Sequence, residues 1–233
     1  MLFRALNTAS TGMAANIFNL DVIANNLANT NTTGFKRSRT NFQDLYYQYY
    51  KLPGAQDTVG QFSPIGTAAG LGVRVAGTQQ DFIQGSINVT GRALDLAILG
   101  DGFFVVQDTL APGGFLYTRN GQLTMNNQFQ LVIASADRGR MIDPPVTIPN
   151  DWTDISISSD GVVTVLTTSS ATPQQVGNIQ LARFFSNEGL YQYGDSFYLP
   201  TEASGPATPN TPGNSRAWGR CVRTPWKRRT PNR

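Results

Sequence analysis

The chain has 233 residues, of which 14% are charged, and it contains no histidine and a single cysteine. Without histidine a Ser/His/Asp triad is excluded, and with Cys221 alone an intrachain disulfide and a Cys/His metal site are excluded as well. The formal net charge of +3 is unevenly spread, because residues 214–233 carry seven basic residues and no acid, which leaves residues 1–213 with a net charge of −4.

The N-terminal residues favour a long helix. Apolar side chains recur at intervals of three and four residues, a spacing that predicts an amphipathic helix of about seven turns with a narrow apolar stripe. The stripe consists of Leu2, Leu6, Ala9, Met13, Ile17, Leu20, Ala24 and Leu27. This start does not resemble a secretory signal peptide, and no apolar run is long enough to cross a bilayer. The polar residues 30–34 are expected to end the helix, which we assign to residues 1–34.

A group of asparagines flanks the end of this stripe. Asn25, Asn26, Asn29 and Asn31 are costly in an isolated helix, because their side chains compete for backbone hydrogen bonds. The stripe either covers the β domain of the same chain or packs against helices outside that domain. We favour the second alternative, because the β region looks self-contained and the amides can then satisfy polar groups of neighbouring copies.

Residues 35–72 are predicted to form an extended segment. It begins with the aromatic sequence Phe42–Tyr50, after which Leu52–Gln56 breaks regular structure. Residues 53–72 are rich in Gly, Pro, Ser and Thr and predict a long loop or an extended excursion.

From about Leu71 to Leu199 the sequence predicts β-structure. Short apolar runs are bounded by turn residues and no helical pattern separates them, as expected for an antiparallel β domain, here residues 73–200. The runs are Val73/Val75, Ile87/Val89, Leu94/Leu96/Ile98, Phe103–Val106, Leu131–Ile133, Ile155/Ile157, Val162–Leu166 and Ile179/Leu181. Residues 201–213 are rich in Pro, Gly and Thr and are predicted to be a linker before the basic tail, residues 214–233.

Motifs that carry chemistry are sparse. Gly100-Asp-Gly102 lacks the third glycine and the following helix of a nucleotide loop, so we expect a tight β-turn. Asp151, Asp154 and Asp160 lack calcium-loop spacing and are expected to be solvated loop residues. The sequence therefore predicts no catalytic, cofactor or metal site.

Several segments carry a resemblance to one family. Ala24-Asn-Asn-Leu-Ala-Asn-Thr-Asn-Thr-Thr-Gly-Phe-Lys-Arg37 resembles the N-terminal signature of the bacterial flagellar rod and hook family. The signature residues are Asn26, Leu27, Ala28, Asn29, Thr33, Gly34, Phe35 and Lys36. Leu94–Val106, Tyr117–Gly121 and Gly189–Gly213 resemble further segments of the family in the same order. Tyr47–Gln56 is similar to the segment that marks the distal-rod branch.

The resemblance implies a fold and a function. The fold is mainly β with a long N-terminal α-helix and an antiparallel β domain of the flagellar rod and hook type. The function is that of a structural subunit of the distal rod, which polymerises helically into a hollow drive shaft and transmits torque from motor to hook, with no enzymatic activity and no cofactor. In the family, N- and C-terminal helices pair as coiled coils around the channel, so inner contacts are expected from Leu6, Met13, Ile17, Leu20 and Leu27. A rod-stiffening segment is expected at Tyr47, Gln48, Pro53, Gly54 and Gln56.

The resemblance also implies partners and a location. The subunit is expected to contact copies of itself, adjoining proximal-rod and hook or hook-junction proteins, surrounding basal-body ring proteins and the flagellar type III export apparatus. It is expected to reach the periplasm-spanning basal body without a cleaved signal peptide, to bind no nucleic acid and to insert into no membrane. One alternative is a proximal-rod or hook-type family member, against which Tyr47–Gln56 argues. An alternative from a different class is nucleic-acid binding through the basic tail, with Trp218 and Trp226 available for stacking.

The last residues depart from the family pattern. After Gly213 the family continues through a Gly-x-Gly-Thr-Leu-Arg-like strand to Leu-Glu-Ala-Ser-Asn and a long helix, whereas Pro225 and Pro231 oppose a helix here. A shifted reading frame permits that pattern, since Trp218-Gly219 then encodes Gly and Trp226-Lys227 encodes Glu. We hypothesise that the residues after about Gly213 are an out-of-frame translation of the gene. If the truncation is real, we expect a soluble β domain with a frayed helix and no rod assembly.

Overall fold

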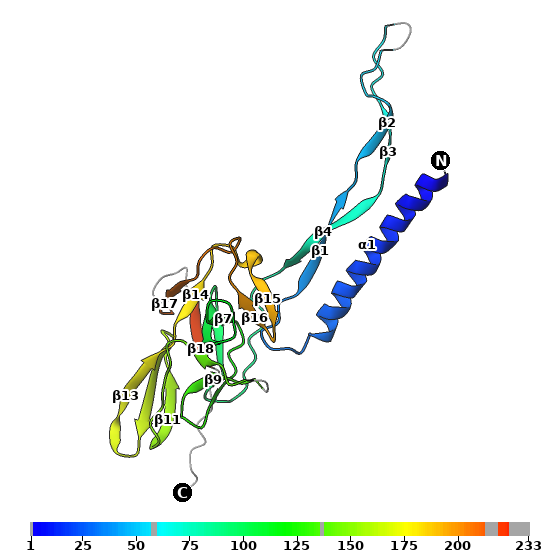
Figure 1. The fold of residues 1–233 in the computed structure, drawn as a ribbon. Helices are drawn as coiled ribbons and strands as arrows, with labels where there is room; N and C mark the ends of the chain where they lie inside the picture. The colour runs from blue at the N-terminus through cyan, green and yellow to red at the C-terminus, as the bar shows by residue number, and fades with distance from the viewer. Residues whose placement is uncertain (1, 57–59, 136–137, 213–218, 224–233) are drawn as a thin grey trace. The chain divides into compact units, whose positions relative to one another are not determined.

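The chain divides into two compact units in the computed structural model, which describes residues 2–56, 60–135, 138–212 and 219–223 (Figure 1). The N-terminal unit comprises Met1–Asn31 and Lys36–Asp81, and the β unit comprises Thr32–Phe35 and Phe82–Arg233. The chain therefore passes into the β unit, returns to the N-terminal unit and enters the β unit a second time.

The N-terminal unit consists of one long helix and a long two-stranded arm (Figure 1). The helix α1 spans Leu2–Ala28, and antiparallel pairs join β1 (Ser38–Asp44) to β4 (Val73–Gln80) and β2 (Tyr47–Lys51) to β3 (Thr67–Gly70). Main-chain hydrogen bonds continue between the two pairs, from Leu45 N–H to the Gly72 carbonyl at 2.9 Å and from Leu71 N–H to the Tyr46 carbonyl at 3.2 Å. Part of residues 53–72, predicted as a loop or an extended excursion, is thus the returning strand of a hairpin.

The β unit is built around a large antiparallel sheet. Its strands follow the spatial order β15-β16-β7-β6-β10-β9-β8, and β14 pairs with both β6 and β17. Their bounds are β6 Phe103–Gln107, β7 Phe115–Thr118, β8 Leu123–Met125, β9 Leu131–Ile133, β10 Met141–Ile142, β14 Leu181–Arg183, β15 Tyr191–Gly194, β16 Phe197–Leu199 and β17 Thr208–Asn210.

Smaller elements complete the β unit. An antiparallel meander is formed by β11 (Trp152–Ile157), β12 (Val162–Thr167) and β13 (Ser170–Asn178). The strand β5 (Leu96–Leu99) pairs with β18 (Arg220–Arg223), and a short 3-10 helix, η1, spans Asn187–Gly189.

The strand β6 is buried on both of its faces. Because successive side chains of a strand point to opposite faces, Phe104 and Val106 belong to the larger core, whereas Phe103 and Val105 belong to a second, aromatic-rich core. Phe103 and Phe104 are both 0% exposed. A strand covered on both faces reads as a continuous apolar run, which is how this segment reads in the sequence.

The predicted fold class is confirmed, because the described residues form one long N-terminal helix followed by antiparallel β-structure. The Ile87/Val89 run differs from its prediction, since no described strand covers it and Val89 is 65% exposed. Residues 201–213, predicted as a linker, contain β17, in which Pro209 is tolerated at the outer edge of β14.

The basic tail is described only in part. Residues 219–223 contribute β18 to the β unit, although no strand was predicted there. The remaining tail residues, 214–218 and 224–233, lie outside the described residues, and with them Trp218 and Trp226. Among the described residues, no helix has both the length and the apolar character needed to span a membrane.

Candidate functional site

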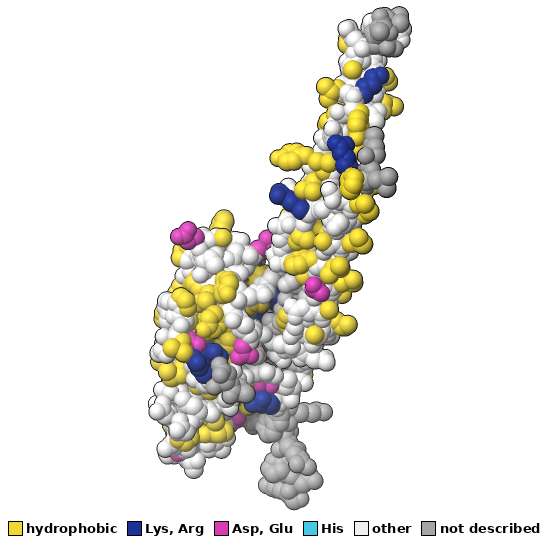
Figure 2. Space-filling view, turned by 45° about the vertical axis from the view of Figure 1, so that its right-hand side comes forward, with side chains coloured by type: hydrophobic (Ala, Val, Ile, Leu, Met, Phe, Trp, Pro, Cys, Tyr) yellow, Lys and Arg dark blue, Asp and Glu magenta, His cyan; other side chains and the backbone are white. Residues whose placement is uncertain are grey.

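The helix α1 presents its apolar stripe to solvent. Leu6, Met13, Ile17, Leu20 and Leu27, the predicted inner-core contacts, are between 61% and 74% exposed. Figure 2 shows hydrophobic side chains gathered along the part of the molecule formed by the N-terminal unit. Contiguous exposed apolar surface of this kind marks an interaction site.

The opposite face of α1 is small and polar, and it packs on the arm strands β1 and β4. Thr8, Thr11 and Ala15, spaced by three and four residues, are buried or half-buried, with Ala15 only 5% exposed. The arm comes so close at Gly72 that a Cβ added there would lie 2.3 Å from Thr11 Oγ1. A helix normally turns its apolar side to its own core, so the amphipathicity of α1 is inverted within this unit.

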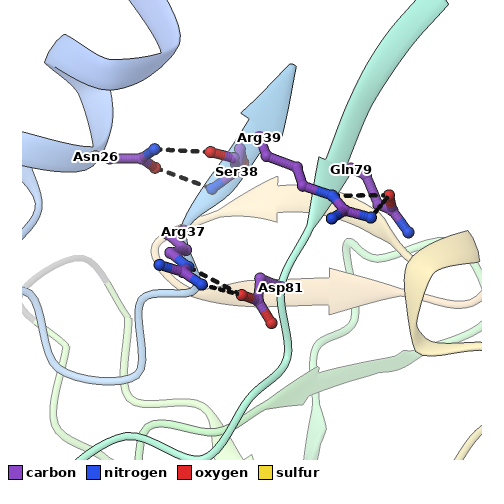
Figure 3. Close-up of polar contacts among 6 residues, drawn as sticks. All are labelled: Asn26, Arg37, Ser38, Arg39, Gln79 and Asp81. Atoms are coloured by element: carbon purple, nitrogen blue, oxygen red, sulfur yellow. Dashed lines mark hydrogen bonds and ion pairs between the residues drawn. The ribbon is translucent and has the colours of Figure 1, made fainter. Parts of the chain in front are cut away.

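Asn26 fastens the end of the helix to the first strand of the arm (Figure 3). Its Nδ2 donates to the Ser38 carbonyl at 2.7 Å, and the Ser38 N–H donates to its Oδ1 at 2.9 Å. The side-chain amide thus pairs with both main-chain groups of Ser38, as a neighbouring strand would. This contact fixes where β1 begins relative to the helix.

Polar contacts also close the base of the arm (Figure 3). The guanidinium of Arg37 donates to Asp81 Oδ2 from Nε at 2.9 Å and from Nη2 at 2.6 Å, and Asp81 N–H donates to the Arg37 carbonyl at 2.9 Å. One step further, Arg39 Nε donates to Gln79 Oε1 at 3.0 Å. The Arg37 side chain is 71% exposed, so its ion pair adds little stability by itself.

Other asparagines of the signature cap the helix from within the chain. Asn29 Nδ2 donates to the Asn25 carbonyl at 3.0 Å and to Asn25 Oδ1 at 2.8 Å. Thr30 Oγ1 donates to the Leu27 carbonyl at 2.8 Å, which satisfies another of the last helical carbonyls. The structure therefore gives Asn26 and Asn29 partners in their own chain, whereas the sequence led us to expect partners in neighbouring copies.

The family-signature residues are divided between the two units of the chain. Asn26–Asn29 lie at the end of α1, Thr33–Phe35 belong to the β unit, and Lys36 lies where the chain re-enters the N-terminal unit. The signature therefore covers the stretch in which the chain passes from one unit to the other.

The predicted rod-stiffening residues lie at the far end of the arm. Tyr47 and Gln48 are on β2, and beyond it Gly54 N–H donates to the Ser63 carbonyl at 2.8 Å, next to Pro53. Gln56 forms an isolated β-bridge with Phe62. Exposed large side chains crowd this end of the arm: Tyr46, Tyr47, Tyr49, Tyr50, Leu52, Phe62 and Ile65.

The contact residues Arg4, Ser38 and Gly72 were not predicted from the sequence. Arg4 Nη1 donates to the Tyr50 hydroxyl at 2.6 Å, and its Nη2 donates to Gln48, so the start of α1 is linked to β2. The spacing of Thr8, Thr11 and Ala15 is the signal for a second, small-residue face of the helix, but it does not say which strand packs there.

Asp108, Arg140 and Cys221 are titratable groups buried inside the β unit. Arg140 Nε donates to Asp108 Oδ2 at 2.8 Å, and this hydrogen bond, more than any other contact, lowers the pKa of Asp108. The Arg140 guanidinium also lies 4.6 Å from the centre of the Phe197 ring. Burial raises the pKa of Cys221 to about 12, so its thiol is held neutral. In the described parts of the chain, no cluster of three or more His, Cys, Asp or Glu residues could hold a metal ion.

Comparison with protein families gives two matches in different parts of the chain. Residues 6–36 match the family described as "Flagella basal body rod protein", and residues 97–165 match the "Flagellar hook protein FlgE/F/G D1 domain". The first match spans the helix and its junction, and the second begins in β5 and ends in β12.

Comparison with individual proteins extends the similarity over most of the chain. The chain is 43% identical to the flagellar basal-body rod protein FlgG of Caulobacter vibrioides over 211 residues, which are 90% of this chain and 79% of the relative. It is 40% identical to FlgG of Buchnera aphidicola subsp. Baizongia pistaciae, again over 90% of this chain and 79% of the relative. The flagellar hook protein FlgE of Escherichia coli is 39% identical over 55% of this chain and 27% of its own length. The chain therefore belongs to the FlgG family of flagellar basal-body rod proteins and is a structural subunit of the distal rod of the flagellar basal body.

Proposed function

We propose that this subunit polymerises with copies of itself into the hollow shaft that transmits torque from the motor to the hook. Its role is mechanical, not catalytic. The contacts of an open helical polymer join two different surfaces of each subunit. Such heterologous contacts can repeat without end, provided that the rotation between subunits does not close a ring. The exposed stripe of α1 is one such surface, and Leu6, Met13, Ile17, Leu20 and Leu27 are the residues that pack against neighbouring helices.

The inverted amphipathicity of α1 is the observation that carries this proposal. The helix uses Thr8, Thr11 and Ala15 to pack on its own arm and leaves its large apolar side chains exposed. Burying a Leu or Ile side chain is worth about 1.5–3 kcal/mol, so five such residues give a strong driving force for helix association. A buried helical layer of this kind forms the inner wall of the shaft.

The arm is proposed to stiffen the rod. Tyr47, Gln48, Pro53, Gly54 and Gln56 lie in a hairpin whose exposed aromatic side chains can pack on adjacent subunits. The hydrogen bonds of Arg4 to this hairpin support the role, because they connect it to the same helix that carries the apolar stripe.

The remaining partners and the route follow from family membership. We propose that the rod contacts proximal-rod proteins at one end and hook or hook-junction proteins at the other, and that it turns inside the basal-body ring proteins. The subunit reaches this periplasm-spanning position through the flagellar type III export apparatus and without a cleaved signal peptide.

A charge placed in the apolar stripe tests the proposal. Ile17→Asp introduces a charge into the exposed stripe, and Asn16→Asp introduces the same charge at the adjacent exposed position. Each full-length variant is expressed in a strain that lacks its own distal-rod protein, and basal bodies with complete rods are counted by electron microscopy. We expect Asn16→Asp to support as many rods as the unsubstituted chain and Ile17→Asp to reduce them at least tenfold.

The thermal unfolding of the purified variants separates assembly from folding. Both positions are exposed, so both substitutions are expected to change the free energy of unfolding by no more than about 0.5 kcal/mol. Equal numbers of rods with Ile17→Asp and Asn16→Asp would contradict the assignment of the stripe. An unsubstituted chain that builds no rods would contradict the proposal that this subunit polymerises.

A further inference from the structure

Residues Thr32–Phe35 form a turn that belongs to the β unit although both neighbouring segments belong to the N-terminal unit. The Phe35 N–H donates to the Thr32 carbonyl at 3.3 Å, and Gly34, in the third position, has φ of +77°. A positive φ at the third position of such a turn is adopted most readily by glycine.

Gly34 lies directly against the main chain of a second turn. A Cβ added to Gly34 would lie 2.9 Å from Asn120 N and 3.3 Å from the carbonyl carbon of Arg119, and main-chain atoms cannot rotate away as a flexible side chain can. That second turn is itself fixed to the core, because a Cβ added to Gly121 would meet the Leu96 carbonyl oxygen and the Leu96 N–H donates to the Gly121 carbonyl at 2.9 Å. Gly34 therefore lies against a turn whose main chain is itself hydrogen-bonded to β5.

A hydroxyl network makes a second connection between the two turns. Ser196 Oγ donates to the Thr33 carbonyl at 3.4 Å. The Thr118 hydroxyl donates to the Ser196 carbonyl at 2.9 Å and accepts from the Asn120 N–H at 3.0 Å. Thr118 is 0% exposed, so this hydroxyl is held in place by packing on every side.

We propose that Thr32–Phe35 is an anchor turn, which fastens the chain to the β unit at its first crossing, with Gly34 and Ser196 as its positioning residues. The second crossing has an anchor of its own, because the Phe82 ring lies 5.8 Å from that of Phe103 and 5.7 Å from that of Tyr198. The mechanical role of the anchor turn rests on the proposed function. In a rod subunit, load on the N-terminal unit enters the β unit along the two chain segments that cross between the units.

Trypsin cleavage of the purified full chain tests the anchor, because Lys36 and Arg37 directly follow the turn. Gly34→Ala combines a positive φ with the main-chain clash, whereas Gly91→Ala places alanine at a nearly equal φ of +75° in open space. Proteolysis of a folded segment requires local opening, so the first cleavage after Lys36 or Arg37, identified by mass spectrometry, measures how firmly the turn is held. We expect Gly34→Ala to accelerate this cleavage about tenfold over Gly91→Ala.

Ser196→Ala tests whether the contact acts across the chain. Removing one neutral hydrogen bond should accelerate cleavage after Lys36 or Arg37 about threefold. Ser169→Ala, which removes the hydrogen bond from Ser169 Oγ to Asp151 at 2.9 Å, is the control and should leave cleavage there unchanged.

Unchanged cleavage after Lys36 and Arg37 in both Gly34→Ala and Ser196→Ala would overturn the anchor. Acceleration that Gly91→Ala or Ser169→Ala reproduces would overturn it as well, because the effect would then be general destabilisation. The assay uses the purified chain and needs no assembled rod, so its failure is distinct from a failure of the proposed rod function.

Discussion

Replacement of Asn26 by alanine tests whether its pairing with Ser38 holds the N-terminal unit together. The change removes two hydrogen bonds, of 2.7 and 2.9 Å, from the main chain of Ser38. Each is worth about 0.5–1.5 kcal/mol net, and Ser38 is half-buried, so water restores only part of the loss. Alanine also has a higher helix propensity than asparagine, which returns about 0.6 kcal/mol. The net expectation is a destabilisation of about 1–2 kcal/mol.

Asn16→Ala is the matched control, because Asn16 is exposed on the same helix and gains the same propensity without losing the contact to Ser38. The assay is thermal unfolding of the full chain followed by circular dichroism at about 222 nm, where α1 dominates the signal as the one α-helix among the described residues. For a unit of roughly 80 residues, 1 kcal/mol shifts the midpoint by about 4–8 °C. Asn26→Ala should therefore lower the midpoint while Asn16→Ala raises it slightly. Equal midpoints for the two variants would refute a stabilising role for the Asn26 amide.

Three further predictions concern other parts of the chain. Gly72→Ala should lower the midpoint of thermal unfolding of the helix, because the added Cβ would lie 2.3 Å from Thr11 Oγ1. Adding Thr11→Ala to this variant should recover part of the loss. A double variant that recovers nothing would exclude the clash as the cause. The pKa of Asp108 is lower in the folded chain than the value of about 3.9 expected in the unfolded chain. Its ion pair with Arg140 therefore stabilises the fold above about pH 3.9, and this stabilisation is lost as the pH falls through the folded-state pKa of Asp108. The free energy of unfolding, measured with urea, should therefore be smaller at about pH 3 than at about pH 5, and this difference should be smaller in Asp108→Asn than in the native chain. An equal difference in both chains would contradict the role of Asp108. Cys221, 2% exposed with a pKa raised to about 12, should react with Ellman's reagent far more slowly in the native chain than in concentrated urea, and equal rates would contradict its burial.

The sequence was sufficient to predict the elements whose signal is local. Apolar spacing predicted α1, and short apolar runs with turn residues predicted strands such as β6, β11 and β12. Periodicity identifies two faces of a helix but does not say which one packs inside its own chain. The inverted orientation of α1 was therefore open until the partners of Thr11 and Ala15 were known.

Contacts between distant segments could not be predicted from local pattern. The arm pairs Ser38–Asp44 with Val73–Gln80, and its register depends on main-chain hydrogen bonds, not on composition. The Gly- and Pro-rich residues 53–72 suggested a loop or an extended excursion, although strands need only backbone groups to pair. The Asn26–Ser38 and Gly34–Asn120 contacts likewise join motifs that the sequence displays only separately.

The pairing of β5 with β18 has a consequence for the order in which the molecule is completed. Leu96 and Ile98 are each 5% exposed, yet the strand beside them, Arg220–Arg223, is supplied only by residues far along the chain. A polypeptide that emerges amino end first cannot cover this edge of β5 until Cys221 has emerged as well. Pairings between strands that are far apart in the sequence also form slowly. The edge of β5 that carries Leu96 and Ile98 is therefore expected to be among the last parts of the β unit to be covered as the chain folds.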